Sequence, residues 1–144
     1  MQSLSEEDFS HLLADLIENA FIAMSDVTDK KILINLGRMG NHLSVEISDN
    51  GQPFSPEIFQ DFGLKAHTTH AGNGGSGIGL MDIWKLKKKY RASLVITEYV
   101  PGTYSYTKQI SLIFDAKKHY IIQTYRRREL GQIRFRDDLY IFPC

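Results

Sequence analysis

The stretch Gly75-Ser76-Gly77-Ile78-Gly79-Leu80 marks the point where a glycine-rich segment gives way to a helical pattern. It closes a run over residues 63–79 that contains six of the eleven glycines of the 144-residue chain and offers almost nothing to bury. A segment of this length inside a compact domain is usually functional. Glycines let backbone N–H groups surround phosphate oxygens, and the N-terminus of a following helix adds positive charge. The run therefore predicts a phosphate-binding loop, with a flexible linker as the alternative.

The spacing of these glycines excludes two common phosphate-binding motifs. The G-x-G-x-x-G spacing and preceding strand of a dinucleotide site are missing, and no Gly-Lys-Ser/Thr follows as in a P-loop. Lys65, Thr69 and His70 lie on the same segment and could add hydrogen-bond donors.

Two amphipathic helices flank the central part of the sequence. An apolar stripe at helical spacing predicts a helix over about residues 6–25, with Ser5 and Asp8 as an N-terminal capping signal. A second helix is predicted from Ile78 to about Tyr90, with the lysines at 85, 87, 88 and 89 outside.

Strand patterns occupy most of the remaining chain. Residues 32–36 and 43–47 alternate on either side of a glycine-containing turn and predict a β-hairpin, while Ser55 and Pro56 predict the start of a short helix. Five further strand-like runs are residues 93–99, 104–114, 119–125, 132–136 and 139–142. This order favours a single domain over residues 1–144 with an α+β fold, in which a largely antiparallel sheet carries helices on one face.

Two polar clusters could carry chemistry. Asp15 and Asn19 are four residues apart on the first helix, so they share a face beside the apolar stripe. Such a pair can bind a hard cation such as Mg²⁺, or the carboxylate can act as a general base; the alternative is a merely solvated helix surface. Asp49 directly follows an alternating strand, where its carboxylate could accept hydrogen bonds from the edge of a base.

Three motifs in this order resemble those of the GHKL ATP-binding superfamily, which includes sensor histidine kinases, type II topoisomerase ATPase domains, MutL-type mismatch-repair proteins and a cytosolic chaperone. Residues 13–20 resemble its N box, residues 49–51 its G1 box and residues 75–80 its G2 box, and the resemblance covers about residues 8–114. It implies the Bergerat fold, a two-layer sandwich with a mixed, mostly antiparallel sheet. Residues 115–144 would then add a C-terminal β extension with an extra hairpin.

The resemblance also implies roles for individual side chains. Asn19 matches the asparagine that binds Mg²⁺ between the ATP phosphates, and Asp15 and Glu18 join it as catalytic candidates. Asp49 matches the aspartate that reads the adenine amino group, and Gly51 follows it in the G1 box. The remaining nucleotide-binding candidates are Lys65, Thr69, His70, Gly75, Gly77, Ile78, Gly79, Leu80 and either Thr103 or Thr107, the last of these being preferred.

The chain departs from the superfamily pattern at two places. Pro53 replaces the second glycine of the G1 box, which stiffens the chain there, and Arg91-Ala92 replaces a Gly-Gly turn that is common after the G2 helix.

Within the superfamily, the catalytic domain of a bacterial sensor histidine kinase fits best. The resemblance then implies in-line transfer of the γ-phosphoryl group of Mg-ATP to a histidine on a separate dimerisation and phosphoacceptor domain, with a response regulator as a further partner. None of the five histidines of the chain lies in a phosphoacceptor motif. An anti-sigma-factor-type serine kinase, a degenerate ATP-binding regulatory domain and a purely structural or protein-interaction domain stay open as alternatives.

Composition and charge limit the classes of protein and the cellular location that the sequence allows. The 17 basic and 17 acidic residues give zero net charge, so a protein that coats nucleic acid is not expected. No run approaches the ~20 apolar residues of a membrane span, and the single cysteine, Cys144, allows no internal disulfide. We therefore expect a cytoplasmic domain, either free or as the cytoplasmic part of a membrane-bound kinase, that itself makes no membrane contact.

The neutral total hides a division of charge along the chain. Residues 1–64 contain three basic and eleven acidic side chains, and residues 65–144 contain fourteen basic and six acidic ones. Much of the basic surplus lies at residues 85–91 and 126–136, including the cluster Arg126–Arg128. We interpret this surplus as a surface for a partner protein, with a solvated strand end as the alternative for the arginine cluster.

Overall fold

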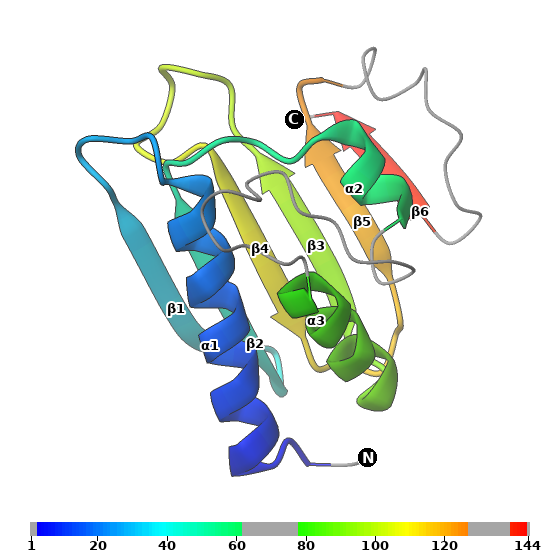
Figure 1. Ribbon diagram of the computed structural model, residues 1–144. Helices are drawn as coiled ribbons and strands as arrows, with labels where there is room; N and C mark the ends of the chain where they lie inside the picture. Colours follow the sequence, from blue (N-terminus) through cyan, green and yellow to red (C-terminus); the bar gives the residue numbers. More distant parts are fainter. Residues whose placement is uncertain (1–2, 62–77, 127–138, 144) are drawn as a thin grey trace.

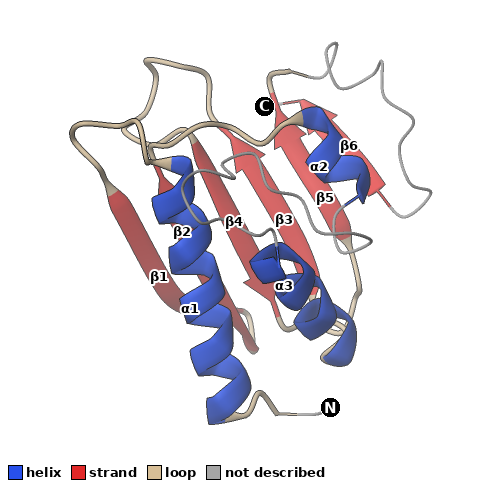
Figure 2. Cartoon of the chain, in the orientation of Figure 1, coloured by secondary structure: helices blue, strands red, loops and turns tan. Residues whose placement is uncertain are grey.

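The computed structural model describes residues 3–61, 78–126 and 139–143. In these ranges, three helices cover one face of a six-stranded sheet (Figures 1 and 2). The helices are α1 (Glu6–Ala23), α2 (Pro56–Asp61) and α3 (Ile78–Lys89). The strands are β1 (Ile32–Met39), β2 (His42–Asp49), β3 (Ser93–Glu98), β4 (Lys108–Ile113), β5 (Tyr120–Thr124) and β6 (Leu139–Pro143). None of the helices in the described ranges is long and apolar enough to cross a membrane.

The sheet is mixed and mostly antiparallel. Its strand order is β1-β2-β4-β3-β5-β6. The pairs β1/β2, β2/β4 and β3/β4 are antiparallel, whereas β3/β5 and β5/β6 are parallel. The predicted α+β fold with helices on one face of such a sheet is thus confirmed.

The C-terminal extension is described in part. The strand predicted at residues 139–142 is present as β6, and it pairs in parallel with β5, with Ile122 opposite Ile141. A parallel pair needs a crossover connection, so β5 is not the hairpin partner of β6. The other strand predicted for that hairpin, residues 132–136, lies outside the described residues.

The strand predicted over residues 104–114 begins later than expected. Strand β4 starts at Lys108, and the preceding residues form a turn. There the backbone N–H of Thr103 donates to the carbonyl of Val100 at 3.2 Å, and Gly102 has a φ of 84°. The tyrosines at 104 and 106 have high strand propensity, but this turn closes before the ladder starts.

Alternation along the four central strands separates a core face from a polar face. Residues two apart point toward the helices and are buried: Val45, Ile47, Leu94, Ile96, Ile110, Leu112, Tyr120 and Ile122. On the opposite face polar side chains pair across strands, as Gln109 does with Ser48 at 3.3 Å and Thr97 with Gln123 at 3.2 Å. The helices complete the core with residues such as Leu12, Leu16, Ala20, Ile83 and Trp84. The sequence period of two is therefore the physical basis of the layered fold.

Helices α1 and α3 run antiparallel, with the acidic start of α1 beside the basic end of α3. Asp8 accepts hydrogen bonds from Lys89 Nζ at 2.8 Å and from the hydroxyl of Tyr90. The hydrogen bond from Lys89, followed by that from Tyr90, holds the pKa of the Asp8 carboxyl below its usual range. Ser5 caps α1 as predicted, because its Oγ accepts from the backbone N–H of Asp8 at 3.1 Å.

One lysine of α3 does not lie outside as predicted. Lys87 is buried, its Nζ lies 4.9 Å from the centre of the Trp84 ring, and it donates to the carbonyl of Lys118 at 3.1 Å. The aliphatic part of a lysine packs well against apolar surface when its ammonium finds such partners. Helix α3 ends at Lys89, and Arg91, two residues later, has a φ of 56° and takes the left-handed position where glycine is common.

The C-terminal end of α1 touches the chain directly after β2. A Cβ atom on Gly51 would lie 2.4 Å from both the carbonyl carbon and the oxygen of Ala23. In this arrangement the N–H of Gln52 donates to that same Ala23 oxygen at 2.8 Å. Only glycine allows this contact between backbones, so Gly51 determines how closely α1 approaches the end of β2.

We therefore expect Gly51→Ala to destabilise the protein by about 1–3 kcal/mol, as overpacking of rigid backbone does. Thermal or chemical unfolding, followed by circular dichroism, measures this loss. Gly37→Ala is the matched control, because the atom nearest to its added Cβ would be Ser44 Oγ at 3.7 Å, an ordinary contact. Equal stabilities of the two variants would contradict the proposed contact.

Candidate functional site

At one end of the sheet, each of the four central strands carries a polar residue that points to the helix-covered face. Asp49 of β2 and Glu98 of β3 both lie opposite Lys108 of β4, and Thr124 of β5 lies two residues after the buried Ile122. These four residues, which we call the buried polar row, are at most 2% exposed. They occupy the same end of the sheet as the C-terminus of α1 (Figure 1).

Asp49 is bound through only one of its carboxylate oxygens. Its Oδ1 accepts hydrogen bonds from Lys108 Nζ and from the backbone N–H of Gly51, both at 2.8 Å. No hydrogen bond to Oδ2 occurs within the described part of the chain. Asp49 therefore keeps one oxygen available as an acceptor for a ligand.

The charges of the row are balanced by an arginine that follows β5. Arg126 donates from Nε to Glu98 Oε1 at 3.1 Å and from Nη2 to Oε2 at 2.5 Å, and Thr124 Oγ1 also donates to Oε1 at 2.6 Å. Burial lowers the pKa of Lys108, while its ion pair and hydrogen bond with Asp49 and the charge of Glu98 oppose that shift. Two carboxylates and two cations thus alternate across the end of the sheet.

The interpretation of Arg126 as part of a partner surface is wrong. Its side chain points inward to Glu98, and its Nη2 also donates to the carbonyl of Phe54 at 2.8 Å. A buried carboxylate needs a paired cation, and Arg126 serves that need. The other two arginines of the predicted cluster, Arg127 and Arg128, lie outside the described residues.

Of the two candidate threonines, Thr107 is the one beside Asp49. Its Oγ1 donates to the carbonyl of Gly51 at 2.7 Å and lies 3.2 Å from that of Asp49, and its N–H donates to the Asp49 carbonyl at 2.9 Å. Thr103 is exposed and bonds to Val100 instead. Asp49, Gly51 and Thr107 therefore form one connected group.

Asn19 lies on α1, one turn before the Ala23–Gly51 contact. Its Nδ2 atom is buried and has no hydrogen-bond partner among the residues that the structure describes. Four helical residues rise about 6 Å, so the contact keeps Asn19 near the G1 segment. A buried amide without a partner is costly, and a ligand could satisfy this one. Glu18, the next N-box candidate, is exposed.

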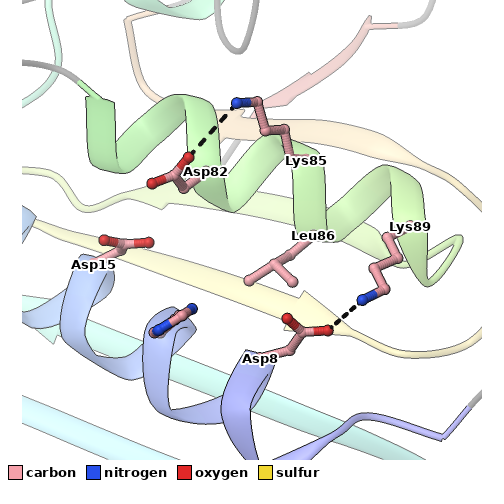
Figure 3. A pocket seen from close by; sticks show the side chains of 7 residues that line it. Asp8, Asp15, Asp82, Lys85, Leu86 and Lys89 are labelled. Atoms are coloured by element: carbon pink, nitrogen blue, oxygen red, sulfur yellow. Dashed lines mark hydrogen bonds and ion pairs between the residues drawn. The ribbon is translucent and has the colours of Figure 1, made fainter.

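Asp15 faces α3 across a pocket of about 450 Å³ between the two helices (Figure 3). Asp82 points toward it from α3, and Asp8, Lys85 and Lys89 also line the pocket. Burial raises the pKa of Asp15 to about 6, with further contributions from the negative charges of Asp82 and Glu18, while the charge of His11 opposes the shift. Asp82 was not among the residues singled out from the sequence.

The remaining candidates belong to the glycine-rich segment and the start of α3. Helix α3 begins at Ile78, contains Gly79 in its first turn and buries Leu80 in the core. Lys65, Thr69, His70, Gly75 and Gly77 lie outside the described residues.

The described side chains fit a magnesium ion that is held largely by its substrate. Among the residues that the structure describes, no cluster of three or more His, Cys, Asp or Glu could hold a metal alone. Mg²⁺ usually takes only one or two protein ligands and completes its shell with phosphate oxygens and water. The amide of Asn19, with its unsatisfied Nδ2, could supply such a single ligand through its oxygen.

Comparisons with known proteins agree with this architecture. The chain is 30% identical over 84 residues to the "Sensor protein CitS" of Halalkalibacterium halodurans, an alignment that covers 56% of this chain and 16% of that protein. The chain thus spans about a sixth of the length of that relative. The structure resembles that of the mycobacterial sensor histidine kinase MprB with a TM-score of 0.61 and 15% identity, over 76% of this chain and 71% of that one. This second likeness concerns the fold alone.

A family match extends over most of the sequence. Residues 5–117 match the family described as histidine kinase-, DNA gyrase B- and HSP90-like ATPase. The matched region contains Asn19, Asp49, Gly51 and Thr107, and it ends before β5. The chain therefore belongs to this family, and its likeness to the ATP-binding domain of sensor histidine kinases, inferred from three short motifs, is confirmed.

Proposed function

We propose that this domain binds Mg-ATP and transfers its γ-phosphoryl group to a histidine on a separate dimerisation and phosphoacceptor domain. The observation that carries the proposal is a pair of polar groups with unused hydrogen-bonding capacity. Within residues 3–61, 78–126 and 139–143, Asp49 has a carboxylate oxygen without a partner, and Asn19 has a buried amide nitrogen without one. The Ala23–Gly51 contact holds the two elements that carry them together.

Asp49 is the proposed reader of the adenine. Its unbonded Oδ2 can accept a hydrogen bond from the exocyclic amine of the base, because an ionised carboxylate is an acceptor only. Thr107 and Gly51 hold the backbone of this segment in place. Ile78, Gly79 and Leu80 begin the helix whose N-terminus favours negative charge, so phosphates are proposed to lie near it.

Asn19 is the proposed protein ligand of Mg²⁺. When bound, the ion would neutralise phosphate charge and thereby favour the departure of the terminal phosphoryl group. Asp15 is proposed to act in the same region by orienting the reacting groups, with Glu18 at the exposed edge of the helix. Lys65, Thr69, His70, Gly75 and Gly77 are proposed to contact the phosphates.

The partners follow from the likeness to sensor kinases. The relative from Halalkalibacterium halodurans is described as a sensor protein, and this chain spans only about a sixth of its length. We therefore propose that the acceptor histidine belongs to another domain, and that a response regulator receives the phosphoryl group afterwards. An anti-sigma-type serine kinase or a regulatory domain without transfer would share the nucleotide site but not the acceptor.

Removing either of the two polar groups should weaken nucleotide binding. We expect Asn19→Ala and Asp49→Asn each to weaken Mg-ATP binding at least about tenfold, since a hydrogen bond to a charged group contributes about 1.5–3 kcal/mol. Isothermal titration calorimetry with a non-hydrolysable ATP analogue and Mg²⁺ measures this change. Asn35→Ala on β1, an exposed asparagine, is the control and should bind like the parent protein.

Two results would count against the proposal. Absence of an ATP-dependent thermal shift in the parent protein at millimolar nucleotide would refute binding itself. The second result is ATP binding without transfer of ³²P from ATP to the phosphoacceptor domain of a full-length sensor kinase. That result would favour the regulatory alternative instead.

The raised pKa of Asp15 makes stability depend on pH in a predictable direction. Because its pKa is about 6 when folded and 3.8 ordinarily, the folded state binds more protons than the unfolded state between these values. Stability therefore falls as the pH rises through that window. Asp15→Asn removes this titration. In nucleotide-free protein, the melting temperature of the variant should therefore rise relative to that of the parent as the pH increases from 4 to 7.

The comparison needs a variant that changes no titrating group. Asn35→Ala serves this purpose, and its melting temperature should follow that of the parent at every pH. A constant difference between Asp15→Asn and the parent from pH 4 to pH 7 would show that Asp15 is not desolvated in the fold.

A further inference from the structure

We infer that Lys108 is a positioning residue that determines which base the site accepts, by keeping Asp49 an ionised acceptor with a single oxygen facing the ligand. This inference rests on the proposed function, since it concerns the same carboxylate. It adds a residue that none of the three sequence motifs contains.

The ammonium group of Lys108 is held in one place. Lys108 is fully buried, and its Nζ donates to Asp49 Oδ1 at 2.8 Å and to the carbonyl of Gln52 at 2.9 Å. The ring of Phe54 lies 5.3 Å from the same nitrogen. Contacts with Asp49 of β2 and with Gln52 and Phe54, on either side of Pro53, therefore hold the ammonium group beside the carboxylate.

The two donors on Asp49 converge on one oxygen. Lys108 and the N–H of Gly51 both bind Oδ1, and this fixes the plane of the carboxylate as well as its charge. The remaining oxygen, Oδ2, is then presented in one orientation. A carboxylate without the lysine would keep only the Gly51 hydrogen bond and could rotate.

The neighbouring charges direct Lys108 to Asp49 instead of Glu98. Glu98 also lies opposite Lys108 in the sheet, but Arg126 and Thr124 occupy both of its oxygens. The negative charge of Glu98 is thereby already paired. Arg126 thus contributes indirectly to the pairing of Lys108 with Asp49, although it lies on the C-terminal side of the family match.

In the part of the chain that the structure describes, the charged groups near Asp49 come from few elements. Lys108 faces it from β4, with Glu98 of β3 and Arg126 farther along the row. Strand β1 places the apolar Ile32 opposite Asp49, and α1 reaches this end with Ala23. The adjacent Lys31 pairs with Asp29, at 3.9 Å.

The consequence is a chemical choice between bases. An ionised carboxylate that faces the 6-position can accept from the 6-amino group of adenine but repels the 6-carbonyl group of hypoxanthine or guanine, and it could accept from their N1–H only if the base shifted in the site. A protonated carboxyl group could donate to that carbonyl group and would tolerate it. By keeping Asp49 ionised, Lys108 excludes the second option.

The test compares ATP with inosine triphosphate, with Mg²⁺ present, from pH 5.5 to pH 8. The parent protein should prefer ATP by a ratio that is constant with pH. In Lys108→Met the unpaired buried carboxyl should take up a proton more readily. The affinity for ATP should therefore fall at least about tenfold at pH 6 and recover in part toward pH 8. The variant should also prefer ATP over inosine triphosphate less strongly than the parent does.

Lys87→Met is the matched control, because Lys87 is also a buried lysine but binds the carbonyl of Lys118 away from Asp49. It should keep the parent's preference and pH profile. A folded Lys108→Met protein with the parent's ATP preference and a flat profile would overturn the inference. If the parent binds no nucleotide at all, the proposed function fails first, so the two failures are distinguishable.

A second measurement needs no variant and covers the case in which Lys108→Met does not fold. Purine riboside triphosphate has hydrogen where inosine triphosphate has a carbonyl group. If Asp49 stays ionised, the parent protein should bind purine riboside triphosphate more tightly than inosine triphosphate at every pH from 5.5 to 8. A reversal of this order at the acidic end would show a carboxyl group that donates, and would overturn the inference.

Discussion

The ion pair between Asp49 and Lys108 is the constraint around which one end of this domain is organised. Both side chains are buried, so neither charge can be left without a partner. Replacing a buried pair by apolar side chains is often neutral or stabilising, which makes stability a poor reason for its presence. The pair instead holds a carboxylate in a fixed position beside the C-terminal end of α1. The paired Glu98 and Arg126 allow this by keeping the row electrically neutral.

Much of the fold could be predicted from the period of the sequence. Alternation identified β1, β2, β3 and β5, and the helical stripe together with Ser5 and Pro56 located the starts of α1 and α2. The start of β4 was missed because tyrosines with high strand propensity continue into the turn before Lys108. The pairing of β6 was missed because a parallel neighbour depends on a crossover, which has no local signature.

Short motifs singled out candidate site residues from the sequence alone. They pointed to Asn19, Asp49 and Thr107 but not to Lys108, although Lys108 occupies an inward position of a strand that continues with Ile110 and Leu112. The role of a charge at such a position becomes apparent only when the strand register places it opposite Asp49. Asp82 was missed for the same reason, since only the antiparallel packing of α3 on α1 brings it toward Asp15. These pairings join residues that are far apart in the chain, and a single sequence has no local pattern that predicts them.

The division of charge along the chain has a partly internal cause. Asp8 pairs with Lys89 and Asp49 pairs with Lys108, so in both cases an acidic residue of the first half meets a basic residue of the second. The first pair also places opposite charges at the ends of two antiparallel helices, where the helix dipoles favour them. Arg126, which contributed to the basic surplus, neutralises Glu98 inside the fold. The surplus that a partner could meet is accordingly smaller than the count along the sequence suggests, and on α3 the exposed Lys85 also lies 3.9 Å from Asp82.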